Sequence, residues 1–247
     1  MGVSFRQYFL SSISVTLLMV AYSLYSREQF YPAMLFLVNS KVSFVVMVNM
    51  ALAISVLIGR ILVGCFFGHL REVELELIYE RAKYSITETL LALTVFRNEL
   101  TPLIFVYFGS LIFVKIFHWI IRSRIDHLEQ VIRVPLRTHV ALVTCMALVL
   151  IADTSISYMC MQYCIAKGRT VIILFAFEFG LLIISAINSL ARYGITTVDS
   201  QMENGLNNKG LYLMILDLIS DAIRFCVYVL FFSLIFIYYG LPIHIIR

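Results

Sequence analysis

The stretch VSFVVMVNMALAISVLIGRILVGCFF, residues 42–67, decides the fold class of this chain. It holds one charged residue, Arg60, and it is longer than the ~20 mostly apolar residues that a helix needs to cross a bilayer. The whole chain has the same character. Of its 247 residues, 61% are hydrophobic and 14% are charged, whereas soluble domains have about 45–50% and about 25%. The sequence therefore predicts a polytopic membrane protein and excludes a soluble enzyme, a disordered chain, a coiled coil and a disulfide-rich secreted domain.

Six further apolar stretches resemble the first in length. The predicted spans are residues 8–25, 42–67, 78–96, 102–121, 139–161, 170–193 and 211–239. The first follows Arg6 and lacks a small-residue cleavage site, so we interpret it as a retained anchor. The apolar patch at 30–38 is too short to span and is expected to lie in the membrane interface. The predicted fold class is all-α, a multi-pass helix bundle that forms a single membrane domain over residues 1–247.

The connections between the spans differ in character. Tight turns are expected at Asn98–Thr101 and at Ala166–Arg169. The segment Asp199–Lys209 contains three asparagines and a glycine and lacks a helical stripe, so it is predicted to be a turn. We find no internal repeat, which argues against a transporter built from inverted repeats.

The positions of lysine and arginine predict the orientation of the chain. A cytosolic N-terminus puts twelve of the 19 Lys and Arg residues on the cytosolic side and six on the opposite side, with Arg224 inside a span. This twelve-to-six bias favours a cytosolic N-terminus. Seven spans that start in the cytosol end in the lumen, so a cytosolic C-terminal domain would need an eighth crossing after Arg247.

Several ionisable residues fall inside the predicted spans. Each charged group costs at least ~2.5–3.5 kcal/mol at the centre of a membrane helix, and such groups usually face the bundle interior or water. Tyr84, Thr87 and Glu88 share one face of the third span, and Lys115, His118 and Arg122 share one face of the fourth. We predict a polar cavity that opens to the cytosol and is lined by Thr87, Glu88, Lys115, His118, Glu178, Asp217, Asp221 and Arg224. The alternative left open is that these groups pair with one another and join the helices.

The sequence offers little catalytic or metal-binding chemistry. It contains no H-E-x-x-H, G-x-S-x-G or P-loop pattern, and we assign neither a catalytic residue nor a metal ligand. His118 is interpreted as a residue that joins helices, and the Asp221–Arg224 spacing favours an ion pair within one helix. Cys160 and Cys164 are interpreted as packed thiols. The net charge of +4 includes no basic cluster dense enough to bind nucleic acid, so the expected surroundings are a lipid bilayer.

Short motifs spread along the whole chain resemble those of one family. They are QFYP (29–32), FFGHLREVELELIYERAKYSITET (66–89), LTVFRNEL (93–100), VKIFHW (114–119), RIDHLE (124–129), FEF (177–179) and VDSQMEN (198–204). In this order and spacing they are similar to synoviolin, the HRD-type ubiquitin ligase family of the endoplasmic reticulum. The resemblance covers the chain from about Tyr8 to Arg247.

The resemblance implies a function and a set of partners. The family ubiquitylates misfolded proteins that are exported from the endoplasmic reticulum, and its membrane domain of about eight helices encloses a hydrophilic cavity that acts as a half-channel. The implied partners are a Derlin-type protein, a lumenal cofactor with tetratricopeptide-like repeats, misfolded polypeptide substrates and a second copy of the chain. The lumenal cofactor is expected on the loop Ser26–Lys41. The implied location is the endoplasmic reticulum membrane.

The chain departs from the family pattern in its catalytic module. The family carries a cytosolic RING-H2 domain in which eight Cys and His ligands hold two zinc ions, and this sequence contains none of those ligands. We therefore expect no cofactor in this chain, zinc in the missing RING, and a ubiquitin-conjugating enzyme as a partner only through that RING. The chain is expected to be the membrane half of a longer ligase or a truncated gene product, and whether it counts as an enzyme stays open.

Other readings of the sequence remain. A ligase of the autocrine motility factor receptor type would share the membrane region and differ in its cytosolic tail. A small-solute or ion transporter is permitted by the intramembrane charges, although the chain lacks paired helices broken by glycine or proline. The last alternative is a ligase-like membrane module without a catalytic role.

Overall fold

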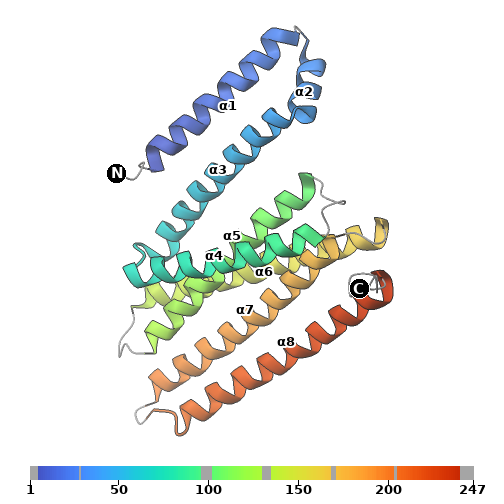
Figure 1. The fold of residues 1–247 in the computed structure, drawn as a ribbon. Coiled ribbons are helices and arrows are strands. Elements are labelled where there is room, and N and C mark those ends of the chain that lie inside the picture. The colour runs from blue at the N-terminus through green and yellow to red at the C-terminus, as the bar shows by residue number, and fades with distance from the viewer. Residues whose placement is uncertain are drawn as a thin grey trace. The chain divides into compact units, whose positions relative to one another are not determined.

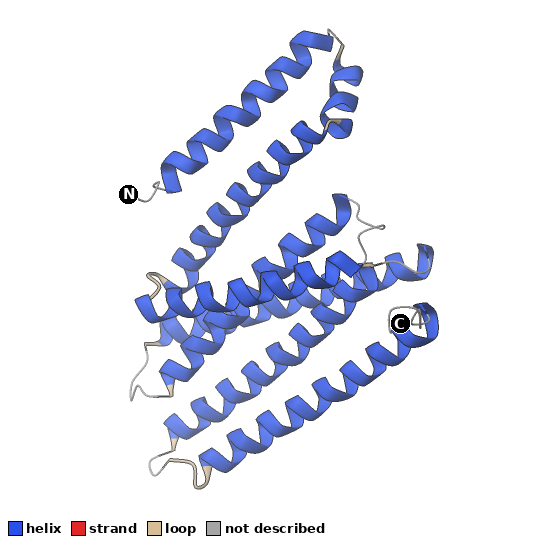
Figure 2. Cartoon of the chain, in the orientation of Figure 1, coloured by secondary structure: helices blue, strands red, loops and turns tan. Residues whose placement is uncertain are grey.

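The computed structural model describes residues 5–27, 29–95, 102–129, 135–167, 171–202 and 205–239. Within these ranges every regular element is an α-helix (Figure 2). The helices are α1 (Phe5–Arg27), α2 (Phe30–Asn39), α3 (Lys41–Phe67), α4 (Glu72–Val95), α5 (Pro102–Leu128), α6 (Leu136–Lys167), α7 (Ile172–Gln201) and α8 (Lys209–Tyr239). The predicted all-α helical bundle is confirmed.

The seven predicted spans coincide with the seven long helices, and α2 covers the apolar patch that was expected in the interface. In the described part of the chain, five helices are long and apolar enough to cross a membrane, namely α1, α3, α5, α6 and α7. Helix α4 does not meet this criterion because charged residues recur along it, and α8 is not among the five in the part of the chain that the structure describes. That these two helices also cross the membrane stays a prediction. The expected eighth crossing and the turn at Asn98–Thr101 lie outside the described residues.

The helices run further into the polar connections than predicted. Helix α5 ends at Leu128 and α7 ends at Gln201, whereas the apolar spans end at 121 and 193. The spans were placed by apolar side chains, but the backbone hydrogen bonds of a helix do not require them. The predicted turn begins only at Met202 and uses left-handed backbone at Gly205 (φ 65°) and Asn208 (φ 66°).

The contacts divide the chain into two compact units, Met1–Cys65 and Phe66–Arg247. In the first unit, hydrogen bonds link the helices. The Tyr8 hydroxyl donates to Asn49 Oδ1 over 2.7 Å, and Asn49 Nδ2 donates to Ser12 Oγ over 3.0 Å. The Ser23 hydroxyl donates to the carbonyl of Ala33 on α2. Polar groups in an apolar environment gain most when they satisfy each other, so these bonds favour the α1–α2–α3 arrangement.

The second unit is built around α5 and α7. Helix α5 packs against α4, α6 and α7, and α7 packs against α5, α6 and α8. Helices α7 and α8 run side by side in opposite directions, as Figure 1 shows. The fully buried side chains of these two central helices include Leu111, Ile120 and Ile125 on α5 and Phe175 and Phe179 on α7. Every residue of the predicted cavity lies in this unit.

Candidate functional site: a charged layer between helices

Helix α5 directs three basic side chains toward four neighbouring helices. Lys115 Nζ lies 2.9 Å from Glu178 Oε2 on α7, and it donates to Ser85 Oγ on α4 over 3.3 Å. His118 and Arg122 follow at i+3 and i+7 on the same stripe of α5. The stripe that the sequence predicted is therefore present, and it faces the inside of the unit.

His118 is paired with an acid on another helix. Its Nε2 lies 2.8 Å from Asp153 Oδ2 on α6, and the two side chains are 6% and 0% exposed. The interpretation of His118 as a residue that joins helices fits this geometry. Sequence reasoning assigned His118 no partner, so it missed the pair with Asp153. In the structure Asp153 lies near the middle of the long helix α6.

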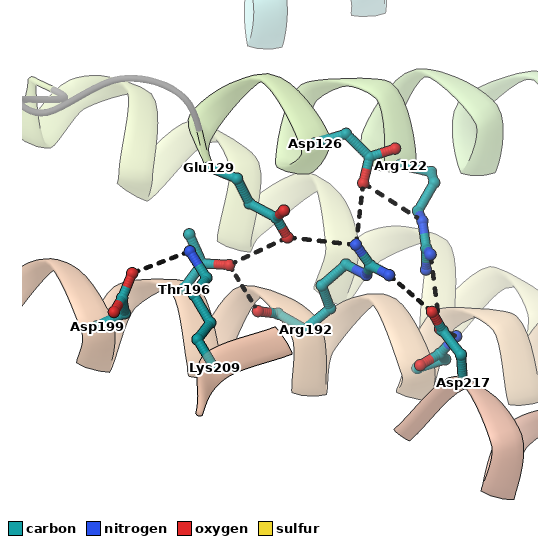
Figure 3. A network of polar contacts seen from close by, with 9 residues as sticks. Arg122, Asp126, Glu129, Arg192, Thr196, Asp199, Lys209 and Asp217 are labelled. Carbon is teal, nitrogen blue, oxygen red and sulfur yellow. Dashed lines mark hydrogen bonds and ion pairs between the residues drawn. The ribbon is translucent and has the colours of Figure 1, made fainter. Parts of the chain in front are cut away.

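A larger ionic network joins α5, α7 and α8 (Figure 3). Its centre is Arg192 on α7, whose Nη2 lies 2.7 Å from Asp217 Oδ2 on α8. The other guanidinium nitrogen, Nη1, lies 3.3 Å from Glu129 and 3.5 Å from Asp126 at the end of α5. One arginine on α7 is therefore linked both to α8 and to the end of α5.

Asp217 is the residue that connects α8 to this network. It accepts a hydrogen bond from Asn188 Nδ2 over 3.1 Å, and its Oδ1 lies 3.5 Å from Arg122 Nη2 on α5. With Arg192 it therefore has three polar partners. These contacts join α8 to both α5 and α7.

Four of the predicted cavity residues are not part of interhelical pairs. The hydroxyl of Thr87 donates to the carbonyl of Lys83 in its own helix, and Glu88 is exposed. Asp221 and Arg224 form the predicted ion pair within α8, with Nη1 and Oδ1 3.1 Å apart. The Asp221 side chain is 69% exposed. The structure thus divides the predicted set into four residues that join helices and four that stay accessible.

An aromatic group lies beside the accessible residues. Phe177 of α7 stacks on Phe231 of α8 with ring centroids 4.0 Å apart, and it contacts Tyr228 edge-on at 5.2 Å. Glu178, the neighbour of Phe177, is joined through Lys115 to Ser85 of α4. Contacts therefore connect this aromatic group on α7 and α8 to α4.

Sequence reasoning did not single out Glu74, at the start of α4. Its side chain is fully buried, and its Oε1 lies 3.1 Å from Arg71 Nη2 and 2.9 Å from Arg124 Nε on α5. Arg124 also donates to the carbonyl of His69. The Arg124–Glu74 pair fixes the start of α4 against α5. The i,i+3 spacing of Arg71 and Glu74 was the one available signal for this site, and it does not indicate burial.

Among the described residues, no group of three or more His, Cys, Asp or Glu side chains could hold a metal ion. Cys145 and Cys160 are buried in α6, which fits packed thiols. The assignment of no catalytic residue and no metal ligand stays a prediction.

Comparison with known proteins decides the family. A family model described as "E3 ubiquitin-protein ligase synoviolin-like, TPR repeats" matches residues 4–247. The chain belongs to the synoviolin-like family. The "ERAD-associated E3 ubiquitin-protein ligase hrd1" of Schizosaccharomyces pombe is 31% identical over 248 aligned residues. That alignment covers 99% of this chain and 36% of the fission yeast protein, so the synoviolin-like chain spans about a third of that relative's length.

The family and the apolar helices agree on the location. The synoviolin-like chain is a multi-pass protein of the endoplasmic reticulum membrane. The resemblance inferred from the motifs is confirmed, and it extends over nearly the entire chain.

Proposed function

We propose that this chain is the membrane domain of an E3 ubiquitin ligase of endoplasmic-reticulum-associated degradation, and that it forms part of the path by which misfolded proteins leave the lumen. The observation that carries the proposal is the distribution of charge in the second unit. Lys115, at the centre of α5, bridges Ser85 on α4 and Glu178 on α7. A related chain in the family acts in the same degradation process, as its name states.

The charged residues of the second unit are suited to the passage of a polypeptide and not to catalysis. Pairs such as Lys115–Glu178 and Arg192–Asp217 hold the helices at fixed positions. The accessible groups Thr87, Glu88 and Asp221 attract water between the helices. Water beside the protein shortens the hydrocarbon path that a polar polypeptide has to cross, because polar backbone is tolerated in a membrane only beside protein or water.

The proposed orientation follows the positive-inside bias. The N-terminus lies in the cytosol, so α5 ends on the cytosolic side and α7 ends there as well. This places the network around Arg192 at the cytosolic mouth of the path. The proposed partners are a Derlin-type protein, a lumenal repeat-containing cofactor and a second copy of the chain.

The proposed catalytic step lies outside the sequence described. Transfer of ubiquitin is assigned to a RING-H2 domain that holds zinc and recruits the ubiquitin-conjugating enzyme. The membrane domain contributes the delivery of the substrate to that site.

Degradation of a lumenal misfolded protein tests the proposal. Replacing Glu88 and Asp221 together by leucine keeps the helices apolar enough to insert but removes two accessible charges. We expect the half-life of the substrate to lengthen in a pulse–chase measurement. The control is Ser14→Leu on α1, an exposed residue whose hydroxyl donates to its own helix. An unchanged half-life in the double variant would count against the proposal.

A further inference from the structure

Glu88 differs from most other acids of the predicted spans. Asp153, Glu178, Asp217 and Asp221 each have a basic partner within 3.1 Å. Within the described part of the chain, Glu88 has no hydrogen bond and no ion pair, and its side chain is exposed. A charge in a membrane helix costs at least ~2.5–3.5 kcal/mol. An ionisable group without a partner in such a helix is therefore a candidate for binding a group from outside the described chain.

The position of Glu88 along α4 adds to this contrast. It lies 16 residues after Glu72, which is about 24 Å along the helix axis. Glu80 is also exposed and without a partner in the described chain, but it lies only eight residues from the helix start, in the more polar half of α4. Among the acids of α4 without a partner in the described chain, Glu88 therefore lies furthest from the start of the helix.

The surroundings of Glu88 are aromatic. Tyr84 precedes it by one helical turn on the same face and is 74% exposed. Tyr228 of α8 is 42% exposed and contacts Phe177, the neighbour of Glu178, and Lys115 links Glu178 to Ser85, one turn before Glu88 on α4. A carboxylate attracts a cation directly, and the faces of tyrosine rings attract a cation through their quadrupole.

Arg81 and Lys83, on α4 itself, form no ion pair with Glu88 in the described chain, and two cations on neighbouring helices are already engaged. Lys115 is bound to Glu178 and Ser85, and Arg224 is bound to Asp221. The site formed by Glu88, Tyr84 and Tyr228 therefore has the acceptor and the aromatic faces for a cation that the described chain does not supply. Helix α4 packs mainly on α5, so the face of α4 that carries Tyr84 and Glu88 is open to another molecule.

We propose that Glu88, with Tyr84 and Tyr228, binds lysine and arginine side chains of the polypeptide in transit. The inference rests on the proposed transit function and names the side chains that the path favours. Basic segments are held at this level of the membrane by the Glu88 carboxylate, and acidic segments are repelled by it. The path therefore discriminates between polypeptide segments by charge.

Photocrosslinking in microsomes tests this inference with two defined probes. One lumenal misfolded protein is made in two versions that differ in one segment, which is rich in lysine in the first and rich in glutamate in the second. Benzoylphenylalanine replaces Thr87, which neighbours Glu88 and bonds only within its own helix. We expect about two- to fivefold more crosslinking of the lysine version, which is the ratio that an exposed ion pair supports.

Three charge variants separate the site from its surroundings. Glu88→Gln is expected to abolish the difference between the two versions, and Glu88→Lys is expected to reverse it. Glu80→Gln, the matched control on the same helix, is expected to keep the difference. The inference is overturned if Glu88→Gln retains the preference or if Glu80→Gln removes it equally. If neither version crosslinks to position 87 in the protein that keeps Glu88, the proposed transit path itself is wrong.

Discussion

His118 Nε2 lies 2.8 Å from Asp153 Oδ2, and this buried pair joins the middle of α5 to the middle of α6. The second carboxylate oxygen of Asp153, Oδ1, has no hydrogen-bond partner among the described residues. Removing His118 would therefore leave an acid that is fully buried and uncompensated. The contact between α5 and α6 depends on this pair more than on any exposed charge.

We expect His118→Ala to destabilise the chain by about 3–5 kcal/mol, the cost of breaking a buried pair from one side. Thermal unfolding in detergent measures the effect. The double variant His118→Leu with Asp153→Leu removes both polar groups and is expected to recover most of the loss, because two apolar groups leave no buried charge. A single variant as stable as the parent would show that the pair does not hold α5 against α6.

The Lys115–Glu178 pair predicts a measurable coupling between α5 and α7. Lys115→Ala and Glu178→Ala are each expected to destabilise the chain, and the double variant is expected to cost less than their sum. The expected coupling is of order 1 kcal/mol, as for polar contacts between membrane helices. A double-mutant cycle on unfolding in detergent gives this value, and strict additivity of the two changes would contradict it.

Arg192 and Arg224 provide a matched comparison of two arginines. Arg192 reaches three acids on two helices and its side chain is 13% exposed, whereas Arg224 pairs with one acid in its own helix and is 33% exposed. We expect Arg192→Ala to loosen α8 and to destabilise the chain by more than 1 kcal/mol, while Arg224→Ala costs about 0–1 kcal/mol. Protease accessibility of the α7–α8 turn, compared between the two variants, measures the loosening. Equal accessibility would contradict the role assigned to Arg192.

The helices could be predicted from the sequence, and so could the stripe on α5. Apolar stretches of ~20 residues indicate helices directly, and the i,i+3,i+7 spacing places Lys115, His118 and Arg122 on one face. The partners of these residues could not be predicted, because spacing fixes a face but not the neighbouring helix. Asp153 lies 35 residues from His118 along the chain, and only the packing of α5 on α6 brings the two together.

The network around Arg192 was missed for a different reason. Asp126 and Glu129 lie beyond the apolar part of α5, where the prediction expected a polar connection. Helix α5 continues to Leu128, and this extension carries both acids to the end of α7. A prediction of helix ends from hydropathy alone cannot detect such extensions.

The central claim is that the accessible residues of the second unit face water that is continuous with the cytosol. Cysteine at position 87 or 221 tests it in sealed microsomes, using a membrane-impermeant thiol reagent and a background in which the native cysteines are replaced by serine. The account predicts labelling of Thr87→Cys and Asp221→Cys from the cytosolic side, and no labelling of Val149→Cys, a buried position on α6. Protection of both positions 87 and 221 in intact, correctly inserted protein would contradict the account.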